Sequence, residues 1–416
     1  MLDTLLCAIV EQPADDALRL VYADALLQAG DLRGELIVRQ CRGEATPELI
    51  DQLTPAWHAV LGPDTRIDVF DRGLPSVIDL YLSSEGLAVL DRAPIHYLKL
   101  HHDRWSLVEA SELEVDDDYE YEPDPTELAR IFAADARAAR LPALDLSHAA
   151  WGAPALAILL SARLSALRSL YLSDEDSTRD ESVEVARAIV ANDTLALTDL
   201  AFCGDSYGDV ADALAILAAS PRAQSLRMLS LANCGLEAPA MDVLAGSPHL
   251  VGLENLELTG GSNTTNRIGD DGLLLLARSP HLARLRRLTI GHNLITDRGL
   301  AVLADPTALP ALDTLACNSA AVTDATIAAM VAARPFAALY LGGCSGLGDA
   351  ALIAIARSPY AATLTGLNLH GTAVGTAGLE ALIASPIEKL AYLGIRVDEA
   401  MKARLRERFG AAALAP

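Results

Sequence analysis

The sequence predicts an α/β solenoid, in which short parallel strands alternate with helices that pack against them. First, a phrase of the form LxxLxL, hydrophobic at its positions 1, 4 and 6, recurs along the chain. Second, each copy leads into an apolar helical run. Third, Ser-Pro or Asp-Pro pairs follow most of these runs. Proline forces its predecessor out of helical conformation, so each pair ends a helix and turns the chain toward the next strand.

The phrase is clearest between residues 226 and 295, and most copies follow one another at about 27 residues. Twelve copies are found in all, and they begin at Val77, Ile95, Leu141, Leu167, Leu197, Leu226, Leu253, Leu285, Leu312, Phe336, Leu364 and Ile387. This period is typical of leucine-rich repeats of the helix-containing, ribonuclease-inhibitor-like type. We therefore expect a leucine-rich repeat horseshoe, with parallel strands on the concave face and helices on the convex face.

A second phrase lies between strand and helix and supports this register. Its copies are IGDDGL (268–273), ITDRGL (295–300), VTDATI (322–327), LGDAAL (347–352) and VGTAGL (374–379). We expect its Thr or Asp to cap the helix, and its small residue to let the helix pack closely. Position 9 of several units is Cys or Asn (Cys234, Asn293 and Cys344), where this repeat type buries a small polar group against backbone.

The first 66 residues are predicted to be a separate helical domain, followed by the repeats at 67–416. We expect helices at the start of the chain, at Asp15–Ala29, at Arg33–Arg42 and from Thr46-Pro47 onward. The stretch DDALRLVYADALLQAGDLRGELIVRQC resembles the bacterial repeat-companion N-terminal domain. The matching residues are Asp16, Arg19, Leu20, Val21, Tyr22, Ala23, Asp24, Gly30, Asp31, Arg33, Gly34, Glu35 and Gln40.

The segment LGPDTRIDVFDRGLPSVIDL also looks like that family's link into the repeats. The chain departs from the family at Ala25, where a tryptophan is usual, so an aromatic anchor on that helix is in doubt. The resemblance implies a bacterial protein whose N-terminal domain accompanies repeats and carries no defined chemistry. Such a domain would cover the first apolar face of the solenoid, since terminal repeats need caps.

The composition of the chain limits the classes of partner that it could bind. The net charge of −24 disfavours nucleic acid and anionic membrane, because both require clustered Lys and Arg. A basic protein partner suits this charge, which also keeps the chain soluble. We expect a cytoplasmic monomer, because no secretory signal or bilayer-spanning run is visible. The six cysteines are scattered without a CxxC pair, as reduced thiols are: Cys7, Cys41, Cys203, Cys234, Cys317 and Cys344.

Two segments stand apart from the regular repeats. An acidic insertion at 103–127 is interpreted as a solvated loop or as a docking arm for a basic partner. Residues 398–409 form a predicted basic, amphipathic capping helix, whose arginines would also suit an acidic surface. No metal site is expected at His101 and His102, because neighbouring strand residues point to opposite faces.

The sequence does not predict an enzyme or a bound cofactor. None of its three lysines follows glycine, which excludes a Walker A loop. The motifs HExxH and GxSxG are absent. The segment GLGDAA at 346–351 fits a dinucleotide-binding pattern, but it coincides with the turn phrase of the repeats, so we interpret it as a repeat feature.

With no enzyme motif found, the remaining candidate function is the binding of another protein at the surface of the repeats. Positions 3, 5 and 7 of the repeat alternate with the core positions, so they line the concave face. The candidate contact residues there are Tyr81, Tyr97, Lys99, His101, Tyr171, Met228, Asn255, Glu257, Arg287, Tyr340, Asn368, His370 and Lys389. We expect a non-catalytic scaffold that binds another protein along this face. The acidic insertion and the N-terminal helices are the other candidate sites.

Two further functions stay open. One is an acidic inhibitor or immunity-type protein that sequesters a basic enzyme, by analogy with acidic ribonuclease inhibitors. The other is a leucine-rich-repeat GTPase-activating protein, which would use a loop Arg or Asn, although no residue singles itself out for that role.

Overall fold

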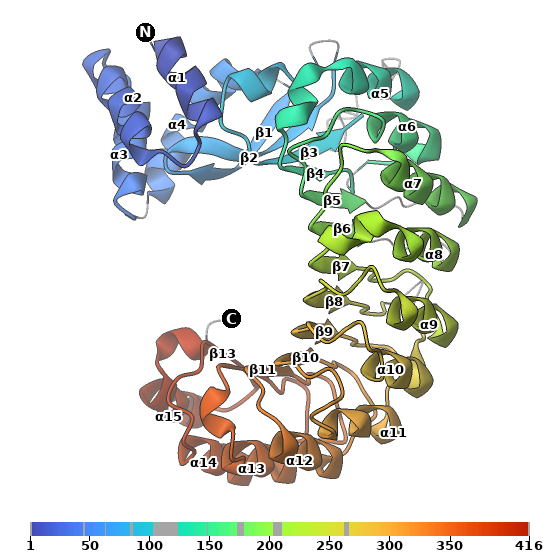
Figure 1. The fold of residues 1–416 in the computed structure, drawn as a ribbon. Helices are drawn as coiled ribbons and strands as arrows, with labels where there is room; N and C mark the ends of the chain where they lie inside the picture. Colours follow the sequence, from blue (N-terminus) through green and yellow to red (C-terminus); the bar gives the residue numbers. More distant parts are fainter. Residues whose placement is uncertain are drawn as a thin grey trace, which may run out of the picture. The chain divides into compact units, whose positions relative to one another are not determined.

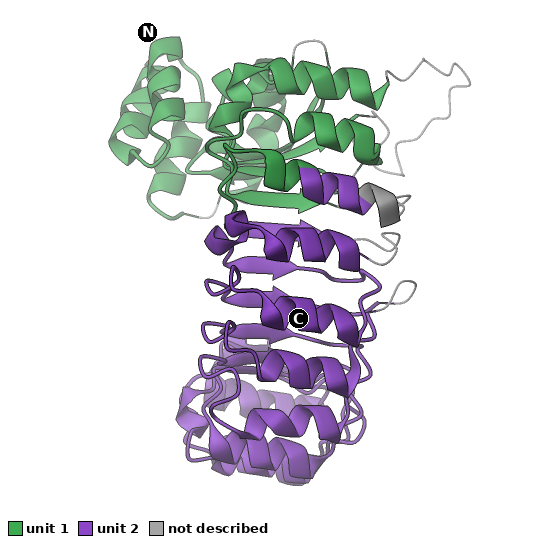
Figure 2. Cartoon of the chain, turned by 45° about the vertical axis from the view of Figure 1, so that its right-hand side comes forward, with its two compact units in different colours: residues 1–176, 188–197 green, residues 177–187, 198–416 purple. Residues whose placement is uncertain are grey.

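The computed structural model describes residues 2–44, 46–62, 64–83, 86–102, 124–147, 149–172, 179–202, 210–261 and 266–414. The chain forms two compact units (Figure 2). Unit 1 comprises residues 1–176 and 188–197, and unit 2 comprises residues 177–187 and 198–416. Most of the predicted acidic insertion, and Cys203, lie outside the described residues.

Unit 1 begins with four helices, which confirms the helical start predicted from the sequence. They are α1 (Leu2–Glu11), α2 (Asp16–Gln28), α3 (Arg33–Cys41) and α4 (Pro47–Leu61). Asp15 caps α2 by accepting the backbone N–H of Ala17 at 2.8 Å. Trp57 of α4 is fully buried in a core shared with Leu26 and Ile37. Thr46 precedes α4 as expected for an N-cap threonine, but its side chain makes no cap bond and accepts a hydrogen bond from Gln40 Nε2 at 3.1 Å instead.

A β-hairpin leads from these helices into the repeats. It joins β1 (Thr65–Asp71) to β2 (Leu74–Tyr81), which run antiparallel. The turn is tied to the helices, because Gly73 N–H donates to Gln40 Oε1 at 2.7 Å and Arg72 Nη1 donates to Asp16 Oδ1 at 2.8 Å. The remaining elements of unit 1 are η1 (Ala88–Asp91), β3 (Tyr97–His101), α5 (Pro125–Ala134), η3 (Ala136–Arg140), β4 (Ala143–Asp145), α6 (Gly152–Leu159) and β5 (Ser169–Leu172). Strands β2 to β5 are parallel.

Helix α7 (Arg179–Ala191) has residues in both units. Unit 2 alternates strand and helix as predicted. Its strands are β6 (Asp199–Phe202), β7 (Met228–Ser230), β8 (Asn255–Glu257), β9 (Arg287–Thr289), β10 (Thr314–Ala316), β11 (Ala338–Tyr340), β12 (Gly366–Asn368) and β13 (Tyr392–Gly394). All neighbours in this series pair in parallel.

The helices of unit 2 follow the strands in turn. They are α8 (Ala211–Ala219), η4 (Pro221–Ser225), α9 (Ala238–Gly246), α10 (Gly269–Ala277), α11 (Asp297–Leu300), η5 (Ala301–Ala304), α12 (Asp324–Ala333), α13 (Asp349–Arg357), η6 (Ala361–Thr363), α14 (Thr376–Ile383), α15 (Glu399–Phe409) and η7 (Ala411–Leu414). Within unit 2, the strands line the inner side of a curve and helices α8 to α14 its outer side (Figure 1).

The core between strands and helices of unit 2 is a stack of leucines at position 4. Each is at most 3% exposed: Leu229, Leu256, Leu288, Leu315, Leu339, Leu367 and Leu393. Position 9 is also buried as predicted. Asn293 Nδ2 donates to Leu258 O at 2.6 Å, and Cys344 Sγ donates to Cys317 O at 3.2 Å. Asn266, which the pattern misses, is fully buried and donates to Leu231 O at 2.7 Å.

The turn phrase contributes more than helix caps, because its aspartate links each repeat to the next. Asp270 accepts the N–H of Thr296 at 2.8 Å, and Asp297 accepts that of Thr323 at 2.8 Å. The next two rungs run from Gly348 N–H to Asp324 and from Gly375 N–H to Asp349, both at 2.7 Å. Each aspartate therefore fixes the start of the following helix. We call this series the aspartate ladder.

The Ser-Pro pairs make a second link between repeats. Ser247 Oγ donates to Ala218 O at 2.6 Å, and Ser279 Oγ donates to Ala245 O at 2.6 Å, so each serine satisfies a carbonyl at the end of the preceding helix. After α12, the buried Arg334 makes an equivalent link to the preceding repeat. Its guanidinium donates to the carbonyls of Ala308, Leu309 and Leu312 at 2.7, 2.6 and 2.9 Å.

Strand pairing corrects the predicted register of the first and last repeats. Ile78 pairs with Leu98, so the first repeat begins at Pro75 rather than Val77, a shift of two that leaves each side chain on its predicted face. Leu367 pairs with Leu393, so the last repeat begins at Leu390 rather than Ile387. No helix among the described residues is long and apolar enough to cross a membrane.

Candidate functional site

The strand-face residues of unit 1 are largely engaged with one another. Tyr97 of β3 donates its hydroxyl to Asp145 Oδ2 at 2.7 Å, and its ring centroid lies 5.5 Å from that of Tyr171. Burial, the Asp145 bond and the Asp145 charge together raise the pKa of Tyr97. Lys99 Nζ lies 2.5 Å from Asp68 and 3.6 Å from Asp79. These side chains are therefore held by intramolecular bonds, and Tyr81 lies beside them on β2.

The prediction that His101 lines an exposed face is wrong, because the residue is only 2% exposed. The chain near Trp151 packs against the end of β3. Trp151 Nε1 donates to Leu100 O at 3.3 Å, and the Trp151 ring lies 5.1 Å from that of His102. The end of the strand is consequently covered.

In unit 2 the predicted residues form two rows across the strands, and all of them are at least partly exposed. Met228, Asn255 and Arg287 pair in sequence at position 3. Position 5 contributes Glu257, Tyr340 and Asn368 from β8, β11 and β12. We call these two rows the strand surface of unit 2.

Lys389 does not belong to the strand surface, contrary to prediction, because β13 begins three residues later. The stretch IEKLAYLGI contains two overlapping matches to the repeat phrase, and only pairing with β12 selects the second. Tyr392 therefore takes position 3 of the last repeat. It is 38% exposed.

Tyr392 and Tyr340 form an aromatic pair on this surface. Their ring centroids lie 6.1 Å apart, and the ring planes make an angle of 43°. Glycines give these rings room. A Cβ atom at Gly366 would lie 3.2 Å from the Tyr340 hydroxyl, and one at Gly394 would lie 2.7 Å from the Tyr392 hydroxyl. The two rings therefore lie over backbone that carries no side chain.

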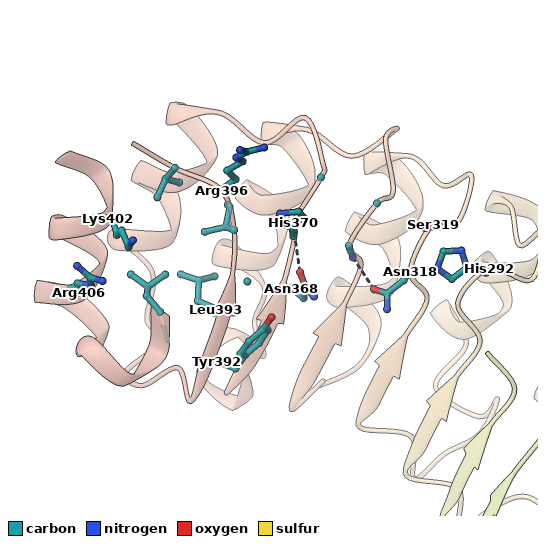
Figure 3. A pocket seen from close by; sticks show the side chains of 17 residues that line it. His292, Asn318, Ser319, Asn368, His370, Tyr392, Leu393, Arg396, Lys402 and Arg406 are labelled. Carbon is teal, nitrogen blue, oxygen red and sulfur yellow. Dashed lines mark hydrogen bonds between the residues drawn. The ribbon is translucent and has the colours of Figure 1, made fainter. Parts of the chain in front are cut away.

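Beside this pair, a pocket of about 790 Å³ occupies the C-terminal end of unit 2 (Figure 3). Its walls come from the turns after β9 to β12, from β13 and the residues after it, and from α15. The side chains on these walls are His292, Asn318, Ser319, Asn368, His370, Tyr392, Leu393, Ile395, Arg396, Val397, Lys402, Arg406 and Leu414. We call this cavity the C-terminal pocket. It contains two predicted site residues, Asn368 and His370.

The lining of the C-terminal pocket is cationic although the chain as a whole carries a charge of −24. Arg396, Lys402 and Arg406 line it, and none of its lining residues is acidic. Lys402 lies 3.5 Å from Glu399, which is itself outside the lining. Among the described residues, the side chains of Arg396 and Arg406 have no hydrogen-bond or ion-pair partner, and both residues are exposed.

Sequence reasoning missed most of this pocket. His292 and Ser319 occupy position 8, in the turn after the strand, whereas the candidate list stopped at position 7. Lys402 and Arg406 lie on α15, whose position as a capping helix was predicted, although its proximity to the strand ends was not. A usable signal was present: the basic C-terminal helix is exceptional in an acidic chain.

The described residues include no group of three or more His, Cys, Asp or Glu arranged to hold a metal ion. Five cysteines are described, and all are free thiols; Cys7 is exposed, whereas Cys234, Cys317 and Cys344 are buried. Burial raises the pKa of Cys317 and Cys344, so neither thiol is activated as a nucleophile.

Comparison with known proteins gives structural likeness only. No family model matches the chain, and no curated protein matches it. The resemblance of the N-terminal helices to the repeat-companion domain, and the domain boundary at residue 66, therefore stay predictions. Among solved structures, a chain of the Rad7 and Elc1 complex from yeast is similar with a TM-score of 0.53 and 16% identity, over 91% of this chain and 85% of that chain.

An internalin (InlF) from Listeria monocytogenes is a more distant likeness. Its TM-score is 0.39 at 17% identity, over 73% of each chain. Together with the strand–turn–helix repeats described above, the likeness to the yeast structure identifies the fold as a leucine-rich repeat solenoid.

Proposed function

We propose that this protein is a non-catalytic scaffold that binds a protein partner through the strand surface of unit 2. The observation that carries the proposal is the Tyr340–Tyr392 pair, held partly exposed over glycines beside the C-terminal pocket. Tyr and Arg are enriched among the residues that dominate binding energy at protein interfaces. Tyrosine suits this use, because it offers a large apolar ring and a polar hydroxyl at a small loss of conformational entropy.

The local chemistry of the surface agrees with binding rather than catalysis. Glu257 accepts a hydrogen bond from Ser230 at 3.1 Å, and Asn368 Oδ1 accepts the N–H of His370 at 2.9 Å. These groups orient each other, and neither pair supplies the nucleophile, base and orienting group that acyl transfer needs. The similar yeast structure is a complex of two proteins, which supports a protein partner here.

The alternative of an acidic inhibitor draws on fold analogy and net charge alone. The C-terminal pocket argues against a basic enzyme as the partner at this surface, because such an enzyme would meet the positive charges of Arg396, Lys402 and Arg406 there. We therefore place a partner with mixed charge ahead of a uniformly basic one.

Photo-crosslinking from two matched positions tests the proposal. A benzoylphenylalanine would replace Tyr392 in one full-length variant and Tyr360 in another; both tyrosines are 38% exposed. Tyr360 lies in the turn after α13 and does not line the pocket. In an extract of the source cells, we expect one discrete partner from position 392 and none from position 360.

The captured partner is then tested with a Tyr340→Ala/Tyr392→Ala variant. In a pull-down of the identified partner without crosslinker, loss of binding at an unchanged melting temperature supports the strand surface as the binding site. Equal crosslinking from positions 360 and 392, or partner binding that the double variant leaves intact, would overturn the proposal.

A further inference from the structure

We propose that the C-terminal pocket binds an acidic segment of the partner, whose carboxylates pair with Arg396, Lys402 and Arg406. This inference rests on the proposed protein-binding function and specifies the chemistry of the partner. A pocket of about 790 Å³ lies within the size range of ordinary ligand sites and accommodates several peptide residues.

The three cations come from two elements that meet at the pocket. Lys402 and Arg406 are four residues apart on α15, so they lie on one face of the helix. Arg396 follows β13. Figure 3 shows Lys402 and Arg406 together at the left of the pocket and Arg396 apart from them, at its top. Arginine presents a planar fork of N–H donors that suits carboxylates.

The other arginines of α15 show why Arg406 is exceptional. Arg404 Nη2 donates to Glu380 at 2.7 Å, and Arg408 Nη2 donates to Ile387 O at 2.6 Å and to Ser385 O at 3.1 Å. These two side chains attach the helix to the last repeats. Arg406 has no such bond among the described residues, so its donors remain available to a ligand.

Backbone donors are exposed at the same place, because two series of inter-repeat hydrogen bonds end there. At position 8, Ser319 N–H donates to Gly342 O at 2.8 Å, and Gly343 N–H donates to His370 O at 2.7 Å. The next donor in this series is Gly371, whose N–H has no acceptor among the described residues.

The second series runs through position 6. Leu341 N–H donates to Asn368 O at 2.8 Å, and Leu369 N–H donates to Gly394 O at 2.7 Å. The next donor is Ile395, directly after the edge strand β13, and its N–H also has no acceptor in the described part of the chain. Both Gly371 and Ile395 line the pocket. An extended peptide along a sheet edge offers carbonyl and carboxylate oxygens to such donors.

Electrostatics favour a short acidic segment over a wholly acidic protein. The chain repels anions at long range because of its net charge of −24. At contact distance, however, the nearest charges in the pocket are cationic. Since these side chains are partly exposed, salt screens their attraction, and binding is expected to weaken as ionic strength rises.

Fluorescence anisotropy of a labelled octaglutamate peptide with the full-length chain tests the inference at low ionic strength. An exposed ion pair is worth up to about 1 kcal/mol, so Arg396→Gln/Arg406→Gln should weaken binding about tenfold. The matched control, Arg284→Gln/Arg357→Gln, removes the same charge from exposed arginines outside the pocket and should leave the affinity within about twofold. Arg406→Lys should retain most of the affinity.

Three results would overturn the inference: no binding by the wild type, an equal loss in both double variants, or displacement of the peptide by millimolar inorganic phosphate. The last result would indicate a small-anion site. If the peptide fails while position 392 still captures a partner, the inference fails and the proposed function stands. If the peptide binds as expected while position 392 captures nothing, the proposed function fails, and the pocket remains only a peptide site.

Discussion

Asp270 accepts hydrogen bonds from both the backbone N–H and the hydroxyl of Thr296, at 2.8 and 2.7 Å, although Thr296 belongs to the next repeat. The carboxylate also lies 3.2 Å from Arg298 Nε. One acidic side chain thus holds the start of the following helix, and a charge at this position becomes a determinant of stability.

This arrangement predicts loss of stability in acid. Burial opposes ionisation of Asp270, but the bonds from Thr296 and the pairing with Arg298 outweigh it and lower its pKa. Its stabilising effect is therefore fully present above the unfolded-state pKa of about 3.9, and is lost as the pH falls through the lower folded-state value. Urea titrations should show Asp270→Asn destabilised by about 1–2 kcal/mol at pH 7, with the difference shrinking below about pH 4.

The neighbouring Asp271→Asn is the control for this series. Its side chain is 70% exposed and pairs with Arg298 on the surface, so it should change stability by no more than about 0.5 kcal/mol. A pH profile that is the same in both variants would contradict the role given to Asp270.

Arg334 is predicted to stabilise the fold through backbone carbonyls, since it forms no salt bridge with any described residue. Burial lowers the pKa of this side chain, and its guanidinium serves the carbonyls of Ala308, Leu309 and Leu312. Arg334→Met would leave the carbonyls of Ala308 and Leu312 without a donor and that of Leu309 with only the N–H of Leu312, at a cost of about 3 kcal/mol in chemical denaturation. The exposed Arg357→Met should cost less than about 0.5 kcal/mol. Equal effects would show that the three bonds contribute little.

Gly34 is predicted to be indispensable for the contact between α2 and α3. A Cβ atom there would meet the Ala23 carbonyl and would lie 2.8 Å from Leu27 Cγ. Since backbone cannot move aside cheaply, Gly34→Ala should lower the free energy of unfolding by about 2 kcal/mol. Gly246→Ala in α9 is the contrasting case, because no atom lies within 4 Å of its Cβ position. That variant should be neutral or stabilising by differential scanning calorimetry.

The Gly366→Val variant should disturb partner binding at the strand surface while leaving the stability of the fold largely unchanged. The new side chain would displace the Tyr340 ring, whose hydroxyl lies 3.2 Å from the Cβ position, while the movable end of the tyrosine absorbs the clash. We expect a change in melting temperature of only a few degrees, together with a clear loss of partner crosslinking from position 392. Unchanged crosslinking would argue that the Tyr340–Tyr392 arrangement is not needed for binding.

The repeats were predictable from sequence because the spacing of apolar residues along each strand and helix shows which side chains are buried. Leucine recurs at the strand position that must face the helices, as Leu229 and Leu256 do. Asparagine or cysteine recurs where a turn needs a hydrogen-bond partner for its backbone, as at Asn293. The helices that start the chain were equally predictable, since Asp15 and Pro47 mark where they begin.

The candidate site was less predictable, because it depends on pairing between repeats. The choice between Lys389 and Tyr392 requires the register of β13 against β12, which local pattern leaves ambiguous. The burial of His101 is a result of tertiary packing, which the alternation of residues along one strand does not report. The approach of α15 to the strand ends is a tertiary contact, so Arg406 carried no signal beyond its charge.

The aspartate ladder stops at a definite residue. Asp349 is its last member, and the corresponding position in the next copy of the turn phrase is Thr376, which lacks a carboxylate. Helix α15 instead starts on its own cap, with Asp398 accepting the N–H of Met401 at 2.8 Å. The rungs therefore tie together only the consecutive repeats from Asp270 to Gly375, and cooperative unfolding is expected to be tightest across that block.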